Sequence, residues 1–466
     1  MARISALPGF ARAVRHEREL HRHERFDRAR LDEHQRRALA RIVAHARARS
    51  PFYRDLYAAH GVDEQTPLHA LPPVDKSDLM ERFDDWVTDP RVTLARAQHH
   101  LSSASQGLLG DKFVVASSGG SSRRPGVFVF DPNEWDVVSA IALRASRWCG
   151  FTPRLPRRRV AFIHAPGAQH MADRVSRTLE LGIHRSQRLA ATQPTDELVA
   201  TLNEFQPTAL VGYASVIALL AAQQIDGQLK IAPSGVLTDG EPRSAEITNR
   251  IRTAWGSEPF DLYAVTETGG GLALDCQAHD GRHVYEDTTI VEVVDADDRP
   301  VPDGNRGHHL LITNLFCRTQ PYIRYRLSDM TAYHPGTCSC GLAFRRLEPI
   351  EGRHDDILEL PGRAGTTVHL HPTVFAPLFT LDGVAELEVV QRGRQLQIAV
   401  VPRSSTDSDA VVGRVRQHAA ATLERYGCDT QPQTLLVSHL TRHPIAGKIK
   451  LVRREIDQQQ PGPGQQ

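Results

Sequence analysis

The chain has 466 residues, which is long enough for a large hydrophobic core and for more than one domain. Its 56 basic and 55 acidic side chains nearly cancel, so overall charge gives no reason to expect a nucleic-acid or membrane partner. No apolar run approaches the ~20 residues that span a bilayer, and the basic N-terminal stretch lacks the apolar core of a secretory signal, so we expect a cytoplasmic protein.

The N-terminal part reads as helical. Residues 31–60 carry apolar side chains at helical spacing, and Pro51 opens a new turn. Asp75 to Asp78 offer an N-cap for a further short helix. We expect a helical lead-in over residues 1–110.

Strand and helix patterns alternate from Lys112 onward. Strands are expected at residues 112–117, 158–167, 208–214 and 234–240, and helices at residues 132–150, 196–206 and 215–224. This alternation predicts α/β layers with largely parallel strands.

The expected secondary structure changes in the last part of the chain. Short strands and turns from about residue 281 to 345 predict a β-rich subdomain. Residues 385–440 read as a compact strand–helix–strand unit that could form its own domain. The tail "DQQQPGPGQQ", residues 457–466, is of low complexity and is expected to be disordered.

Four segments that are remote in sequence carry the candidate chemistry. They are "SSGGSSRRP" from Ser117 to Pro125, "FDLYAVTETGGG" from Phe260 to Gly271, "IRYRLSDM" followed by "EGRHDDIL", and "RHPIAGKIKLVRR" near the C-terminus. Each alone has an ordinary explanation, because Ser and Gly favour turns, acidic residues cap helices, and lysines lie at surfaces.

Together and in this order, the segments resemble the adenylate-forming superfamily, specifically its phenylacetate–CoA ligase-like branch. The matching pieces are "SSGGSSRRP", "LTDGEP", "YAVTE", "IRYRLSDM", "GRHDDIL" and the Gly447–Lys448 pair, and the resemblance spans roughly residues 53–453. It implies a large N-terminal domain, residues 1–352, of layered α/β structure with a β-rich subdomain. It also implies a small mobile α+β C-terminal domain, residues 353–456.

The resemblance implies an ATP-dependent ligase that adenylates a small aromatic carboxylic acid, releases pyrophosphate, and transfers the acyl group to CoA. Three second steps stay open beside CoA transfer: transfer to an amine, transfer to a carrier protein, and diazotisation with nitrite. A non-catalytic nucleotide-binding relative is the rival interpretation. A monomer and a homodimer both remain open.

The resemblance also implies roles for individual residues. The residues that would hold the β/γ-phosphates are Ser117, Ser118, Gly119, Gly120, Ser121 and Ser122. The other nucleotide-binding residues would be Gly240, Glu241, Asp261, Tyr263, Asp329 and Arg353. The catalytic set would be Lys448, Thr266 and Glu267, with Glu267 holding Mg²⁺. Asp355 would be the hinge, and the acid pocket would be formed by His164, Tyr213, Ala264 and Gly269.

A cysteine and histidine set predicts a metal site. Cys276 lies in "CQAHDGRH" and Cys338 and Cys340 in "CSCG", a pattern that suits structural Zn²⁺ with one histidine. Relatives that carry zinc favour His283 over His279 as the fourth ligand. A disulfide and three unrelated buried thiols are the alternatives.

The phosphate loop departs from the family pattern. Ser122-Arg123-Arg124 stands where many relatives have Thr-Gly-Lys or Thr-Gly-Glu. The role of the two arginines stays open, although two guanidinium groups would strengthen the attraction to phosphate oxygens.

Overall fold

The structure is a computed structural model. It describes residues 7–63, 65–103, 107–117, 126–152, 154–165, 167, 170–178, 184–353, 357–370, 374–375, 377–378, 381–403, 406–440 and 452–455. In the described part of the chain, no helix is both long and apolar enough to cross a membrane.

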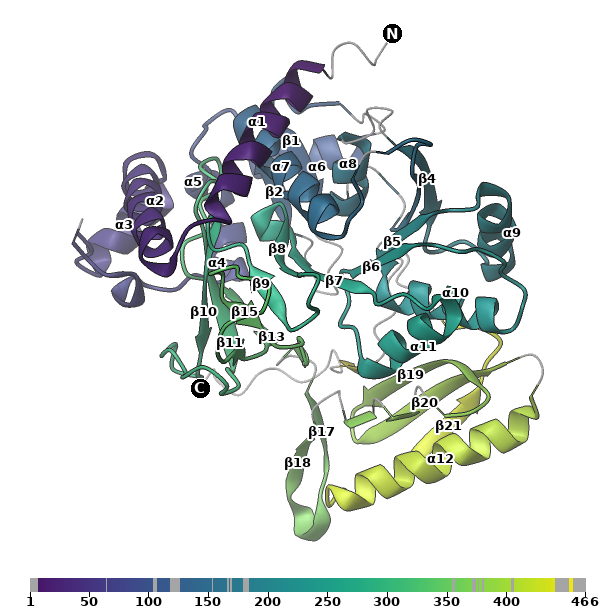
Figure 1. Ribbon diagram of the computed structural model, residues 1–466. Helices are drawn as coiled ribbons and strands as arrows, with labels where there is room; N and C mark the ends of the chain where they lie inside the picture. The colour runs from purple at the N-terminus through teal and green to yellow at the C-terminus, as the bar shows by residue number, and fades with distance from the viewer. Residues whose placement is uncertain are drawn as a thin grey trace.

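The described N-terminal residues before β1 are mainly helical. Their elements are α1 (Leu7–His23), α2 (Arg28–Arg49), α3 (Pro51–Ala59), η1 (Leu68–Ala70), α4 (Lys76–Glu81), α5 (Phe83–Trp86) and α6 (Leu94–Ser102). Ser50 both ends α2 and caps α3 by accepting a hydrogen bond from Tyr53 N, and Pro51 takes the first position of α3. Figure 1 shows α2 and α3 together at one side of the molecule, and it shows α1 packed beside α7.

A nine-stranded sheet forms the centre of the N-terminal part, in the order β14-β15-β9-β8-β7-β6-β5-β3-β4. Its strands are β3 (Arg159–His164), β4 (Arg185–Ala190), β5 (Ala209–Tyr213), β6 (Gly235–Asp239), β7 (Phe260–Val265), β8 (Gly270–Asp275), β9 (Arg282–Val284), β14 (Tyr333–His334) and β15 (Arg346–Leu347). The helices that connect or cover it are α7 (Pro132–Trp148), α8 (Met171–Thr178), α9 (Thr195–Phe205), α10 (Ala214–Ile225) and α11 (Ala245–Trp255).

The expectation of parallel strands holds for half of this sheet. Strands β4, β3, β5, β6 and β7 run parallel, as the alternating pattern predicted, because each connection between them contains a helix. From β7 to β14 the pairings are antiparallel, since short turns such as η2 (Thr266–Thr268) reverse the chain directly. The sheet is therefore mixed.

Smaller sheets flank the large one. The pair β1 (Val114–Ser117) and β2 (Val127–Phe130) brackets the expected phosphate loop. The expected β-rich region contains the antiparallel sheet β10 (Thr289–Val294), β11 (His309–Asn314) and β12 (Tyr325–Leu327). It also contains β13 (Asp329–Met330), which pairs with β16 (Gly352–Arg353), a strand that follows the region.

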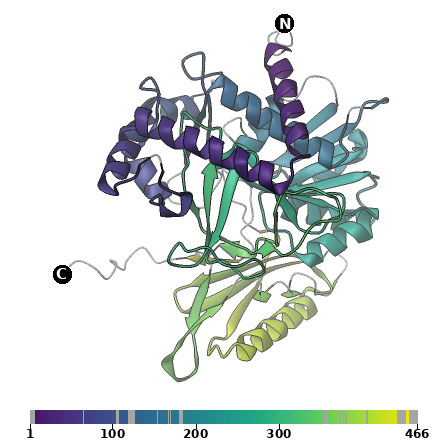
Figure 2. The ribbon, with the colours of Figure 1, turned by 60° about the vertical axis from the view of Figure 1, so that its left-hand side comes forward.

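The C-terminal part has its own sheet and hydrophobic core. Strands β19 (Val384–Arg392), β20 (Gln395–Pro402), β21 (Pro432–Leu436) and β22 (Val452–Glu455) form a four-stranded sheet, and α12 (Ser408–Arg425) packs on it through Val411, Val415, Ala419 and Leu423. The hairpin β17 (Leu358–Pro361) and β18 (Thr367–Leu370), with η4 (Arg363–Gly365) between its strands, adds to the same core. In Figure 2 this unit lies below the N-terminal helices and the central sheet.

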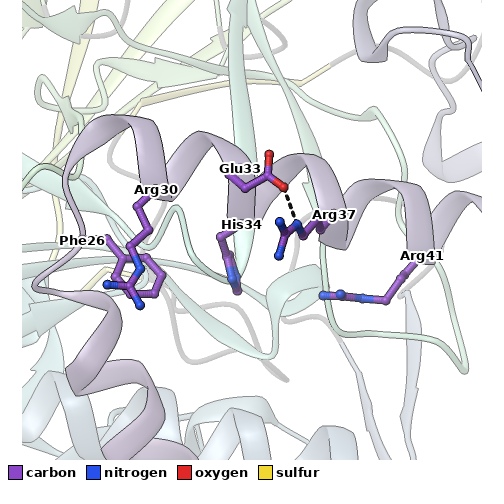
Figure 3. Close-up of a pocket in the computed structure, with 6 residues that line it drawn as sticks. All are labelled: Phe26, Arg30, Glu33, His34, Arg37 and Arg41. Atoms are coloured by element: carbon purple, nitrogen blue, oxygen red, sulfur yellow. Dashed lines mark hydrogen bonds and ion pairs between the residues drawn. The ribbon is translucent and has the colours of Figure 1, made fainter.

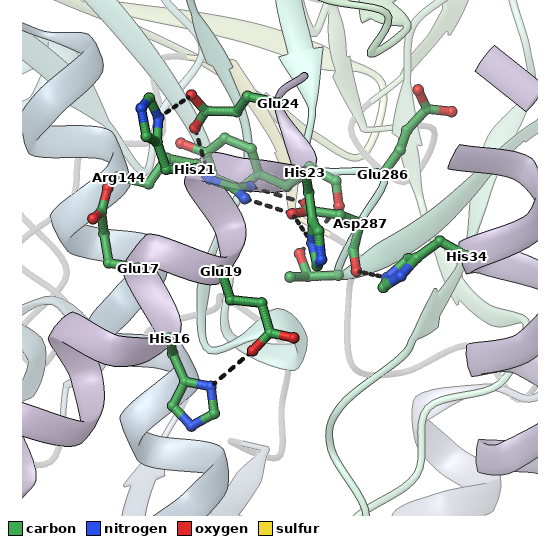
Figure 4. A network of polar contacts seen from close by, with 12 residues as sticks. His16, Glu17, Glu19, His21, His23, Glu24, His34, Arg144, Glu286 and Asp287 are labelled. Carbon is green, nitrogen blue, oxygen red and sulfur yellow. Dashed lines mark hydrogen bonds and ion pairs between the residues drawn. The ribbon is translucent and has the colours of Figure 1, made fainter. Parts of the chain in front are cut away.

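A buried ion-pair network ties α1 to the central helix α7. Arg144 donates to both carboxylate oxygens of Asp287, at 2.9 and 2.5 Å, and both side chains have no exposed surface. His23 and Glu24, at the end of α1, contact the same pair (Figure 4). Burial raises the pKa of Asp287, but the nearby Arg144 lowers it more, so that the net pKa falls well below the usual range. The N-terminal helices are thus anchored by electrostatic contacts as well as by packing.

Candidate active site at the strand ends

Three polar side chains stand at the carboxyl ends of neighbouring parallel strands. His164 ends β3, Tyr213 ends β5 and Asp239 ends β6. His164 Nε2 lies 2.9 and 3.0 Å from the two Asp239 carboxylate oxygens, and the Tyr213 ring meets the imidazole edge-on at 5.2 Å between centroids. Of these, His164 and Tyr213 were expected in the acid pocket. Asp239 was not, because nothing in its own sequence context pairs it with a residue 75 positions earlier.

The next strand, β7, carries a contact to the distant β13. Tyr263 donates its hydroxyl hydrogen to Asp329 Oδ2 at 2.8 Å. Asp329 pairs in turn with Arg353 across the antiparallel ladder of β13 and β16. Three residues that were expected around the nucleotide, from segments up to 90 positions apart, are therefore neighbours in the fold.

The turn that follows β7 holds the expected magnesium ligand. Glu267 Oε1 accepts a hydrogen bond from the Tyr325 hydroxyl at 3.1 Å, and Asn314 Nδ2 donates to the Glu267 backbone carbonyl at 3.2 Å. Neither Tyr325 nor Asn314 was expected at the site, although Tyr325 lies within the "IRYRLSDM" motif. Thr266 accepts the Gly269 N–H at 3.0 Å and so closes the same turn.

Gly269 satisfies two conditions that only glycine meets easily. Its φ is +73°, and a Cβ built there would lie 2.2 Å from Val138 Cγ2 on α7. The preceding residues Thr266 to Thr268 are therefore held directly against α7. Ala264 lies in β7, two residues before this turn, where the pairing of β7 with β8 is irregular.

Two further nucleotide candidates make internal contacts. The Asp261 carboxylate accepts hydrogen bonds from Arg282 and from the Thr238 hydroxyl, and it is only 4% exposed. Glu241 Oε2 accepts the Ser215 backbone N–H at 2.9 Å, which fixes the Gly240–Glu241 segment to the start of α10.

Lys76 lies beside the exit of the phosphate loop. A Cβ at Gly126, the first described residue after the loop, would lie 3.4 Å from Lys76 Cε. The preceding Val74 is held to β12 on both sides, because its N–H donates to Arg324 O and its carbonyl accepts from Arg326 N. Lys76 is one of only five lysines in the sequence, and these backbone bonds are what place it at the loop.

Several expected residues lie outside the described part of the chain. They are Ser118, Gly119, Gly120, Ser121 and Ser122, with Arg123 and Arg124, the hinge residue Asp355, and the catalytic lysine Lys448. Ser117 is described at the end of β1, where it forms a bridge with His170. The phosphate loop therefore starts next to the segment that follows His164.

The cysteine and histidine set converges as a metal site would. The ligand atoms of Cys276, His283, Cys338 and Cys340 all lie within 4.8 Å of one another. The Cys276 and Cys338 sulfurs are 3.6 Å apart, close to the ~3.8 Å edge of a tetrahedron with 2.3 Å zinc–sulfur bonds.

His283, and not His279, completes this set. His283 Nδ1 donates to Phe344 O at 2.8 Å, which leaves the Nε2 lone pair 3.3 Å from Cys340 Sγ. Burial lowers the pKa of His283 to about 4, so the ring is neutral and able to bind a metal at physiological pH. His279 packs on the Phe260 ring instead.

A shallow surface pocket of about 280 Å³ lies on α2, away from these groups (Figure 3). Its lining residues are Phe26, Arg30, Glu33, His34, Arg37 and Arg41. Arg37 pairs with Glu33, and Arg30 lies over the Phe26 ring, so the lining is partly neutralised by its own contacts.

No family model matches the chain. The phenylacetate-coenzyme A ligase of Escherichia coli (strain K12) is 27% identical to it over 426 residues, which cover 87% of this chain and 86% of the relative. The crystal structure of 2-hydroxyisobutyryl-CoA ligase in the postadenylation state, in complex with R3-HIB-AMP, matches with a TM-score of 0.75 at 22% identity. That match covers 94% of this chain and 92% of the other.

The same ligase with 2-HIB-AMP and CoA, in the thioesterification state, matches with a TM-score of only 0.61, although it covers 93% of this chain and 91% of the other at the same identity.

Proposed function

Because the chain belongs to the adenylate-forming superfamily, in its phenylacetate–CoA ligase-like branch, we propose that it is an AMP-forming acid–CoA ligase. In the first half-reaction a carboxylate oxygen attacks the α-phosphorus of ATP, and pyrophosphate leaves. In the second, the CoA thiol attacks the acyl-adenylate, and AMP leaves as the thioester forms. The observation that carries this proposal is the meeting of Tyr263 with Asp329, and of Glu267 with Tyr325, at the carboxyl edge of the sheet, where α/β proteins bind nucleotides.

The nucleotide would lie along the end of β7. Asp329 can accept hydrogen bonds from both ribose hydroxyls, and its ladder partner Arg353 would contact the same sugar. Tyr263, held by Asp329, would stack on the adenine, next to the Gly240–Glu241 segment. Asp261 would support this strand from inside, because its carboxylate is already bonded to Arg282.

The phosphates would be held from two sides. The backbone N–H groups of residues 117–122 would cradle the β/γ-phosphates, and Lys76 would supply a positive charge next to that loop. Glu267 and Thr266 fit a magnesium ion, because oxygen ligands are what this hard cation prefers, and the ion would neutralise charge that builds up as pyrophosphate leaves. Tyr325 would fix the Glu267 carboxylate by its hydrogen bond.

Lys448 would come from the C-terminal domain. A lysine ammonium between the attacking carboxylate and the α-phosphate would attract both groups. We place the domain boundary between residues 352 and 353 and the hinge at Asp355, directly after the β13–β16 ladder.

The acid would lie next to the nucleotide, at the ends of β3, β5 and β6. His164 and Tyr213 would form one wall, and Ala264 and Gly269 another. We propose a small aryl acid, because two flat rings, His164 and Tyr213, offer an aromatic edge and face at this position.

A structural zinc ion would be bound by Cys276, His283, Cys338 and Cys340. Four protein ligands leave no open position for a substrate, so the ion would stabilise the β-rich region by joining β9 to the segment before β15.

The decisive experiment measures acid-dependent release of pyrophosphate from ATP, with and without CoA, across a panel of aryl acids. We expect release with at least one acid, a thioester product when CoA is present, and a loss of about 10²-fold or more in Lys448→Ala. Lys450→Ala, two positions further on, is the matched control and should retain activity. Absence of release with every acid would favour a non-catalytic nucleotide-binding protein instead.

A further inference from the structure

The His164–Asp239 pair lies where the acid is expected, one strand away from the nucleotide segment. Asp239 ends β6, and β6 is the direct neighbour of β7, which carries Tyr263 and leads to Glu267. Ser117, at the start of the phosphate loop, bridges to His170, only six positions after His164. The pair is therefore bordered by the groups that we assign to ATP.

The fold alone does not require an ion-capable pair here. His164 is 6% exposed and Asp239 is 8% exposed. Each is the last residue of a mainly apolar strand, β3 or β6. Well-packed apolar side chains are often as stabilising as a buried pair of this kind. A buried polar pair at a ligand-binding edge is therefore better explained by a polar group on the ligand.

The hydrogen-bond geometry says which polar group. A carboxylate only accepts hydrogen bonds, so the proton of the imidazole is on Nε2, which faces both Asp239 oxygens. In this tautomer Nδ1 carries a lone pair that can accept a hydrogen bond, and no described residue lies within hydrogen-bond distance of it.

Tyr213 helps to hold the His164 ring in this orientation. Its hydroxyl oxygen accepts the Ala165 N–H at 3.2 Å, and burial raises the pKa of the phenol, so the group remains protonated. Its ring packs against the edge of the imidazole and keeps it from rotating away from Asp239.

We propose that the acid activated by this chain carries a hydrogen-bond donor, a hydroxyl or an amino group on the aryl ring, and that the donor is bound by His164 Nδ1 with Asp239 as the positioning residue. The inference rests on the proposed function and names the substrate class of the same site. A site built to bond a hydroxyl or amino group rejects the analogue that lacks it by far more than a shape difference would, so we expect a preference of about 100-fold or more in kcat/KM.

The first test compares matched acids. Pyrophosphate release is measured with benzoate and phenylacetate, and with the three ring positions of their hydroxyl and amino derivatives. At least one substituted acid should exceed its unsubstituted parent by about 100-fold in kcat/KM. Equal activity with the parent acids would overturn this inference and leave the ligase proposal standing, whereas no release with any acid would defeat both.

The second test uses variants of the pair. Asp239→Asn allows the imidazole to adopt the other tautomer, with the proton on Nδ1, so the preference for donor groups should fall by about 10-fold or more. His164→Phe keeps a flat ring but lacks the Nδ1 acceptor, so the ratio of kcat/KM between the substituted acid and its unsubstituted parent should fall by about 10-fold or more.

A control variant separates selection of the acid from a general effect on the fold. Asp136→Asn alters a similarly buried carboxylate, which pairs with Arg12 on α1, and should leave the ratio between the acids unchanged. If the two site variants lower release equally for all acids, or if they lower only thioester formation, the pair serves the fold or the second half-reaction and does not select the acid.

Discussion

Replacement of Gly269 by alanine should disturb both stability and adenylation. The φ of +73° alone costs an L-residue about 1–2 kcal/mol. The added Cβ would also lie 2.2 Å from Val138 Cγ2, and Val138 is a short, stiff side chain on α7 that cannot swing away. Overpacking of this kind costs about 1–3 kcal/mol, so we expect a total loss of about 2–5 kcal/mol in the free energy of unfolding.

Gly256 provides a matched control. It has a similar φ of +65°, but a Cβ there would meet nothing within 4 Å. Gly256→Ala should therefore lose only the conformational share, about 1–2 kcal/mol. The difference between the two variants measures the contact with Val138.

The assay combines urea unfolding, followed by circular dichroism, with pyrophosphate release. Because Gly269 closes the turn that carries Thr266 and Glu267, a shift of about 1 Å in that turn should lower kcat/KM by about 10²-fold in Gly269→Ala. Adding Val138→Ala should restore part of both losses, with a coupling energy of about 1 kcal/mol or more. Equal destabilisation of the two glycine variants, with full activity in both, would refute the reasoning.

Four other changes test separate parts of the structure. Asp287→Asn removes the carboxylate that accepts from both terminal nitrogens of the fully buried Arg144 and leaves only Glu24 beside it, so the free energy of unfolding should fall by about 3–5 kcal/mol in urea titrations; a loss below 1 kcal/mol would show that the pair does not anchor α1. Burial raises the pKa of Glu134 to about 7, above its unfolded value of 4.5, so the stability it contributes is full below pH 4.5 and is lost as the pH rises through 7. The free energy of unfolding should fall by about 3 kcal/mol over this window, and Glu134→Gln should flatten the fall; an unchanged slope would contradict the assignment. Cys338→Ser should abolish binding of about one zinc ion per chain, measured by elemental analysis, and a well-folded wild type without zinc would defeat the metal site. Lys76→Ala should raise the KM for ATP by about 10-fold while the KM for the acid is unchanged, and an equal effect from Lys112→Ala, at the opposite end of β1, would exclude a specific phosphate contact.

Local patterns in the sequence predicted the local structure well. The helix expected from Pro132 is α7, which starts there because Asp131 and Glu134 form a capping box. The strand expected at residues 234–240 is β6, which ends at Asp239. In both cases the deciding contacts lie within a few residues, so the pattern alone carries them.

Contacts between remote segments could not be predicted in the same way. The antiparallel half of the central sheet depends on pairings such as that of β9 with β15, whose residues are more than 60 positions apart. The pairing of His164 with Asp239 and the position of Lys76 are likewise products of strand order. Only the resemblance to a known family brought Tyr263, Glu267 and Asp329 together before the fold did.

The short ladder of β13 and β16 links Asp329, the proposed ribose ligand, to the start of the C-terminal part. Asp329 faces Arg353, and the described chain resumes at residue 357 in the next unit. A nucleotide bound at Asp329, as we propose, would lie beside the proposed hinge, so its binding energy and the orientation of the C-terminal unit would be thermodynamically linked. By reciprocity, a domain orientation that binds AMP less tightly is also the orientation that bound AMP disfavours. One coupling free energy would then govern both the release of AMP and the rotation of the C-terminal unit.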